Sequence, residues 1–176
     1  MARTPLVMGN WKMNHSRAAS RDWCRSLQER LSEKPLHGGA ELGVAPPFTA
    51  LDVLAEGVGS RLILAAQNVH WETSGAFTGE VSAEMLAEVG CRMVIIGHSE
   101  RRHVFGENDE RISRKVEAAT EAGLIPILCV GETEQQRDAG RTEMVIEDQL
   151  RRGLERRRFE DPAHLVVAYE PVWAIG

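Results

Sequence analysis

Short apolar runs alternate with longer amphipathic segments along this chain, and that alternation limits its possible folds more than any other feature. Some of the intervening segments carry apolar residues at helical spacing, such as Trp23, Leu27 and Leu31. Strands that alternate with helices indicate parallel βα units joined by right-handed crossovers. The sequence therefore predicts an α/β fold, either a doubly wound sheet or part of a (β/α)8 barrel. The six expected strands cover residues 6–9, 42–45, 62–66, 94–96, 124–130 and 165–169.

Capping residues predict where several helices begin and end. Polar side chains able to cap a helix are expected at Ser16, Thr49, Ser82, Asn108 and Thr133. In the helix after Ser82, the spacing of Met85, Leu86 and Val89 predicts an inward-facing side, and Gly90 suits the left-handed residue that ends a helix.

Composition narrows the class of protein. A length of 176 residues with 43% hydrophobic and 27% charged residues is typical of one globular domain, here predicted to span residues 1–176. The net charge of −5 argues against nucleic acid as a partner. The three cysteines form no CxxC pair, and no signal-peptide pattern or apolar run long enough to span a membrane is present. We therefore expect a cytoplasmic protein that does not bind membranes.

One stretch joins a buried strand directly to reactive side chains. Residues 94–96 are β-branched, Gly97 permits a sharp turn, and His98 follows where the strand should end. Ligands bind at the carboxyl ends of parallel strands, so His98 is a candidate functional residue. The alternative is that His98 only caps the next helix, while Glu100 and the neighbouring arginines form a solvated network. These residues alone do not distinguish the two interpretations.

Polar residues also follow the first and last expected strands. Asn10 and Lys12 come after the first strand and Glu170 after the sixth. A barrel would bring these groups and His98 around one opening, whereas an open sheet can leave its first and last strands far apart. No motif for a serine hydrolase, a zinc protease or a nucleotide-binding loop is present. A carboxylate, an imidazole, an ammonium and a carboxamide suit proton transfer beside a carbonyl.

A long segment without periodicity interrupts the pattern at residues 67–80. Loops of this length in compact domains are usually functional. Phe77 lies near the expected tip, where an exposed aromatic side chain would favour burial against a partner. The alternative is a loop folded back on its own surface.

Several motifs, spread over the whole chain, closely resemble those of the triosephosphate isomerase family. They occupy residues 8–12, 65–68, 75–80, 97–102, 129–132 and 169–176. Matches of this length and order are far more specific than a lone glycine motif. The resemblance implies a (β/α)8 TIM barrel and the interconversion of glyceraldehyde 3-phosphate and dihydroxyacetone phosphate, a step of glycolysis and gluconeogenesis. It also implies a homodimer and the absence of a cofactor or a catalytic metal.

The resemblance further implies a role for individual residues. Glu170 would be the general base, His98 the electrophile, and Lys12 and Asn10 would bind substrate and the developing oxyanion. The supporting residues around them would be Glu100, Ser99 and Cys129. The resemblance places Phe77 and Thr78 in a loop that inserts into the partner subunit, residues 171–173 at the hinge of a mobile lid, and Gly176 beside the substrate phosphate.

The chain departs from the family pattern in length. The family barrel has eight strands and about 250 residues, whereas this sequence matches only about the first six βα units and stops within the lid. Three interpretations follow: a truncated isomerase, a split enzyme completed by a separate C-terminal fragment, or an assembly or binding protein without turnover. A different enzyme on the same barrel is the remaining alternative, since fold does not determine function.

Overall fold

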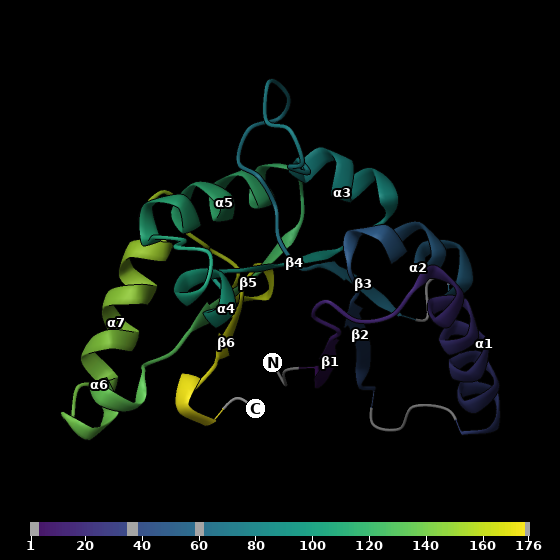
Figure 1. The fold of residues 1–176 in the computed structure, drawn as a ribbon, viewed down its shortest axis with the longest axis horizontal. Helices are drawn as coiled ribbons and strands as arrows, with labels where there is room; N and C mark the ends of the chain where they lie inside the picture. The colour runs from purple at the N-terminus through teal and green to yellow at the C-terminus, as the bar shows by residue number, and fades with distance from the viewer. Residues whose placement is uncertain (1–3, 35–38, 59–61, 175–176) are drawn as a thin grey trace.

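A computed structural model of the chain describes residues 4–34, 39–58 and 62–174. Its six strands form one sheet in chain order, and every neighbouring pair is parallel. The sheet curls into an arc with helices along its outer side, and the two edge strands lie near its open end (Figure 1). The strands are β1 (Leu6–Asn10), β2 (Glu41–Ala45), β3 (Ile63–Ala66), β4 (Met93–Ile96), β5 (Ile125–Val130) and β6 (Val166–Tyr169).

The helices follow the predicted pattern closely. Ser16, Ser82 and Asn108 each accept a hydrogen bond from a backbone N–H in the first turn of the helix that they cap, and Thr133 forms a complete capping box with Gln136. The helices are α1 (Arg17–Glu33), α2 (Leu51–Val58), α3 (Ala83–Val89), α4 (Ser99–His103), α5 (Asp109–Glu121), α6 (Glu134–Asp138) and α7 (Thr142–Gly153), with short 3-10 turns η1 (Phe48–Ala50), η3 (Pro162–His164) and η4 (Val172–Ala174).

Two of the local predictions were wrong. Thr49 does not cap a helix: it lies inside η1, which follows Pro47 without a side-chain cap. Met85 does not face inward, because its side chain is 51% exposed, whereas Leu86 is fully buried. A seven-residue helix presents a narrow buried face, and residue 85 lies outside it.

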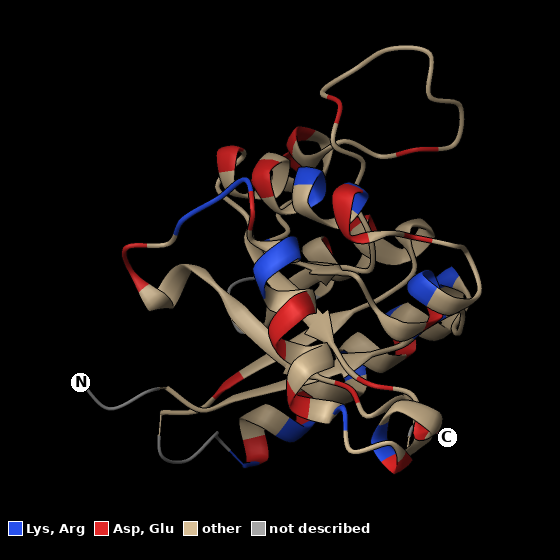
Figure 2. Cartoon of the chain, turned by 90° about the vertical axis from the view of Figure 1, so that its left-hand side faces the viewer, with Lys and Arg blue, Asp and Glu red and all other residues tan. Residues whose placement is uncertain are grey.

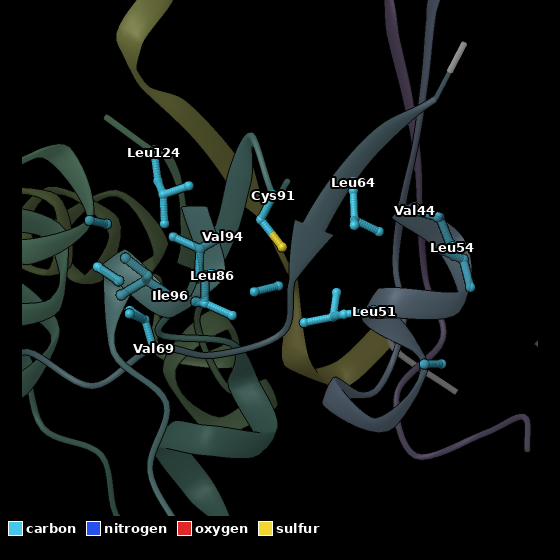
Figure 3. Packing of buried hydrophobic residues seen from close by; sticks show 14 of the residues in the cluster. Val44, Leu51, Leu54, Leu64, Val69, Leu86, Cys91, Val94, Ile96 and Leu124 are labelled. Carbon is cyan, nitrogen blue, oxygen red and sulfur yellow. The ribbon is translucent and has the colours of Figure 1, made fainter. Parts of the chain in front are cut away.

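The core has two layers, one on each side of the sheet. Val94 and Ile96 of β4 face outward into a large cluster beneath the helices (Figure 3), while Ile95 faces the inside of the curl. The inner cluster contains Ala45, Ile63, Ala65, Met93, Ile95, Ile127 and Cys129. Helices cover the outer layer, and side chains from several strands fill the inner one, as in a barrel. This arrangement decides between the two folds that the sequence left open.

The edge strands are less covered than the central ones. Every residue of β3 and β4 is buried, whereas Val7 on β1 and Val167 and Tyr169 on β6 are 61%, 47% and 54% exposed. These side chains alternate with half-buried neighbours along each strand. The outer faces of both edge strands therefore lack the helical cover that the central strands have.

The surface mixes charges of both signs. Figure 2 shows Lys and Arg interspersed with Asp and Glu along the helices in view. The loop of residues 67–80 projects from the body of the molecule in both views (Figures 1 and 2). Within residues 4–34, 39–58 and 62–174, no helix is both long and apolar enough to cross a membrane.

Candidate active site

His98 caps helix α4 and also contacts another predicted site residue. Capping a helix and belonging to the site are therefore compatible. Gly97 ends β4 with a φ of 72°, a conformation that glycine adopts without strain. The Nδ1 atom of His98 then accepts a hydrogen bond of 3.2 Å from the N–H of Glu100, at the start of α4. The other ring nitrogen, Nε2, lies 3.3 Å from Oε1 of Glu170. His98 is 6% exposed, so few other orientations are open to it.

The cap also fixes the tautomer of the imidazole. Because Nδ1 accepts a hydrogen bond from the Glu100 N–H, it does not carry a hydrogen in this arrangement, and the ring hydrogen lies on Nε2. The Glu100 carboxylate is 3.6 Å from Nδ1, too far for a hydrogen bond. His98 therefore presents an N–H donor to the interior of the site.

Glu170 is held by contacts from two elements, β5 and α4. Its own N–H donates to the Val130 carbonyl over 2.8 Å, which places it directly after β6 and beside the end of β5. Its Oε2 atom accepts a 3.0 Å hydrogen bond from the N–H of Ser99, the first residue of α4. Its Oε1 atom lies 3.4 Å from the Sγ of Cys129. These contacts hold the carboxylate of Glu170 beside the Nε2 atom of His98.

Cys129 meets Glu170 as a thiol rather than a thiolate. Burial raises the pKa of Cys129 above its usual value, and the adjacent Glu170 carboxylate raises it further. The S–H group can therefore donate to the carboxylate of Glu170. A thiolate at this position would instead repel it.

Lys12 has an unusual backbone that neighbouring side chains support. Its φ of 51° is uncommon for a residue with a side chain. The side chain of Asn10 accepts from the Lys12 N–H at 3.0 Å, and the Nε2 of Gln67 donates to the carbonyls of Lys12 and Ala45 at 2.9 and 2.8 Å. Strained backbone of this kind is often found at functional sites.

The predicted site residues form one connected group. The Nζ of Lys12 lies 2.9 Å from Oε1 of Glu100, and Glu100 in turn donates its N–H to His98. The group therefore extends from β1 through α4 to Glu170 after β6, across the mouth of the curled sheet. Gln67 belongs to it as well but was not predicted as a site residue, although its place directly after β3 was the available signal.

The other predicted residues lie elsewhere. Phe77 is 41% exposed and its ring centre is 4.5 Å from that of His70, within the projecting loop. Thr78 is exposed in the same loop. The predicted phosphate contact, Gly176, lies outside the described residues.

A second group of contacts fixes the segment that follows Glu170. Glu132 is 1% exposed, and its carboxylate accepts hydrogen bonds from Tyr169 and Trp173. Burial acts to raise the pKa of Glu132, but these hydrogen bonds, together with one from the backbone, hold it below its usual value. The guanidinium carbon of Arg137 lies 3.6 Å from the centre of the Trp173 ring. Sequence analysis did not predict this role for Glu132.

Parallel βα units with polar groups gathered at the carboxyl ends of the strands define the (β/α)8-barrel class of enzyme. The sequence model of the triosephosphate isomerase family matches residues 5–176. The triosephosphate isomerase of Synechococcus sp. (strain WH7803) is 50% identical over 175 residues, which cover 99% of this chain and 70% of that protein. That of Symbiobacterium thermophilum is 51% identical, over 99% of this chain and 67% of that protein.

A solved structure agrees with these relatives. The crystal structure of triosephosphate isomerase from Bartonella henselae superposes with a TM-score of 0.86 at 36% identity, over 98% of this chain and 70% of that one. The chain belongs to the triosephosphate isomerase family, whose members are isomerases, and it spans about 70% of the length of the relatives named here.

Proposed function

We propose that this site interconverts D-glyceraldehyde 3-phosphate and dihydroxyacetone phosphate by moving a proton between adjacent carbons, in the cytoplasm, as a step of glycolysis and gluconeogenesis. One observation carries the proposal: the Glu170 carboxylate lies 3.3 Å from Nε2 of His98, the ring nitrogen that carries the hydrogen. This pairing puts a base beside a hydrogen-bond donor, which is what proton abstraction next to a carbonyl requires.

Each step balances within the substrate and these side chains. Glu170 removes the proton from the carbon next to the carbonyl, and the electron pair moves onto the carbonyl oxygen to give an enediolate. The Nε2–H of His98 donates a hydrogen bond to the oxygen that gains charge, and the hydrogen of the neighbouring hydroxyl then moves to that oxygen. Glu170 returns its proton to the neighbouring carbon, and the carbonyl forms on the carbon that lost the proton. To act, the carboxylate must leave the Ser99 N–H that holds it at 3.0 Å.

Lys12 and Asn10 bind and stabilise the anion in this proposal. The Lys12 ammonium is paired with Glu100 and is about one-third exposed, so it can also attract a phosphorylated substrate. Asn10 holds the strained Lys12 backbone in place. Glu100, Ser99 and Cys129 act on the other groups: Glu100 positions Lys12, and the other two position Glu170. Gly176 would contribute to binding the phosphate.

Assembly is part of the proposal. A homodimer would cover the projecting loop with Phe77 and Thr78. A separate C-terminal polypeptide with two further βα units would cover Val7 on β1 and Val167 on β6 and pair with both strand edges. These open edges also favour a second candidate function, in which residues 1–176 form one partial barrel domain that acts only as an assembly module.

The test is isomerase turnover by the purified chain, with Glu170→Gln prepared in parallel to reveal contaminating host enzyme. We expect the substitution to lower the turnover rate at least about a thousandfold, because general base catalysis contributes on this scale. A preparation in which both proteins turn over equally would contradict the role of Glu170. If neither is active, the measurement is repeated with the C-terminal fragment added: recovered activity supports a split enzyme, and continued inactivity supports the assembly module.

A further inference from the structure

We propose that Gln149 is a positioning residue for the general base, acting through the backbone of Gly131; this inference rests on the proposed role of Glu170. Gln149 lies on α7, distant in sequence from every residue of the site. Its side-chain amide makes two hydrogen bonds to one residue: Oε1 accepts from the N–H of Gly131 at 2.8 Å, and Nε2 donates to the Gly131 carbonyl at 3.0 Å.

The double hydrogen bond occurs where the sheet stops supplying partners. The last paired residues of β5 and β6 are Val130 and Tyr169, so Gly131 is the first residue beyond the ladder. Gly131 is buried, and a buried peptide group without a partner is costly. Gln149 continues the pairing with a side chain, and reversing its amide would place donor against donor and acceptor against acceptor.

Gly131 is also in direct contact with the backbone of Glu170. A β-carbon added to Gly131 would lie 1.8 Å from the Glu170 carbonyl oxygen and 2.7 Å from the carbonyl carbon. The two backbones are therefore in van der Waals contact. A shift of the Gly131 backbone would displace the backbone of Glu170 and, with it, the carboxylate. Two backbone hydrogen bonds flank this contact. The Glu170 N–H donates to the Val130 carbonyl, and the Val172 N–H donates to the Glu132 carbonyl.

Anchoring α7 is not the main task of Gln149, because apolar packing already anchors that helix. Ile146, Leu150 and Leu154 pack against the outer core cluster, and Gly153 approaches Leu128 so closely that an added β-carbon would lie 3.2 Å from its side chain. The two hydrogen bonds to Gly131, a residue in contact with the Glu170 backbone, therefore serve to position that backbone more than to dock the helix. Misplacement of a catalytic group by about 1 Å can reduce a rate about a hundredfold.

The consequence can be measured at a residue that Gln149 does not touch. The amide of Ser99 begins α4 and donates to the Glu170 carboxylate, while the next amide, Glu100, donates to His98. If Gln149 positions Glu170, its loss should expose the Ser99 amide and leave the Glu100 amide protected. A purely structural role would accelerate exchange of both amides together.

The experiment compares hydrogen exchange of these two amides by NMR in the 176-residue chain and in Gln149→Met, which keeps the side-chain length and removes both hydrogen bonds. We expect Ser99 to exchange at least about tenfold faster in the variant, with Glu100 changed much less. Gln149→Glu, which keeps the acceptor for the Gly131 N–H and loses the donor, should give a smaller acceleration. The matched control is Gln28→Met, because Gln28 also donates to a glycine carbonyl, that of Gly57, but far from the site.

A kinetic measurement is made on the same proteins. Where the unaltered chain turns over, Gln149→Met should lower kcat about a hundredfold and leave KM within about twofold, because substrate contacts remain while the base is displaced. Equal acceleration of Ser99 and Glu100, or a Ser99 amide that is unprotected even in the unaltered chain, would overturn the proposal. If the unaltered chain has no activity, only the proposed function fails for the isolated chain, and Ser99 exchange still decides the role of Gln149.

Discussion

The centre and the edges of the sheet contribute to the site in different ways. β4 and β5 are covered on both sides, and they carry His98 and Cys129, whose side chains are buried and fixed by nearby groups. β1 and β6 are open on their outer faces, and they lead to Lys12 and Glu170. The donor in this proposed mechanism therefore follows a strand that is covered on both sides, whereas the base and the cation follow strands that are open on one side.

Hydrogen bonds from amide side chains to the backbone support the segments that lead from the edge strands into the site. Gln67 supports the segment after β1, and Gln149 supports the residue that touches Glu170. Strands that lack a neighbour on one side lose ladder hydrogen bonds and packing, and the amide side chains replace part of that support. At the centre, Arg102 makes contacts of the same kind: its guanidinium donates to the carbonyl of Gly97, directly after β4, and to that of Cys129 on β5.

The largest predicted effect uses the same truncation at the centre and at an edge. Val94→Ala on β4 should lower the free energy of unfolding by about 2–3 kcal/mol, because it removes two buried methyl groups and leaves a cavity. Val167→Ala on β6 should cost less than about 1 kcal/mol, because that side chain is already 47% exposed. Urea unfolding measures both values.

The same pair of variants tests whether a partner covers the edge. If a second polypeptide pairs with β6, the cost of Val167→Ala should rise toward that of Val94→Ala when the polypeptide is added, whereas the cost at Val94 should stay constant. Equal costs for the two variants in the isolated chain would show that the edge is already packed in solution and would contradict the contrast drawn here.

A smaller effect on stability is predicted when the hydrogen bonds that support the Lys12 backbone are removed. Gln67→Met removes the hydrogen bonds to the carbonyls of Lys12 and Ala45. The Ala45 carbonyl still accepts from the Trp11 N–H, whereas the Lys12 carbonyl loses its partner. We expect a loss of about 1–3 kcal/mol in the free energy of unfolding, together with weaker binding of a phosphorylated substrate as the Lys12 segment relaxes. Chemical denaturation and calorimetric titration measure the two effects. Gln28→Met is again the control, and an equal loss of binding in that variant would remove any special role for Gln67.

The sequence predicted the elements and most residues of the candidate site, but not the contacts that hold those residues in place. Alternating apolar runs gave the six strands, and the residue types after three of them gave Lys12, His98 and Glu170. Gln67 and Lys12 are 55 residues apart, and Gln149 and Gly131 are 18 apart. Hydrogen bonds over such separations leave no periodic pattern, so folding has to bring the partners together before they can be identified. Met85 was misplaced for a related reason, since its spacing fitted a buried face that the short helix does not extend to.

The smallest predicted effect concerns the pH dependence of stability near the edge strand. The pKa of Glu132 is lower in the folded chain than its usual value, so its contribution to stability is fully present above the unfolded-state pKa, about 4.3. It is lost as the pH falls through the lower folded pKa. Glu132→Gln keeps an acceptor for Tyr169 or Trp173 but cannot titrate. Unfolding measured between about pH 3 and pH 7 should therefore show a shallower decline on the acidic side in the variant. Parallel profiles for the two proteins would mean that the charge of Glu132 does not help to link β5 to the segment after β6. Uncharged hydrogen bonds, the Arg137–Trp173 contact and backbone hydrogen bonds would then hold that segment.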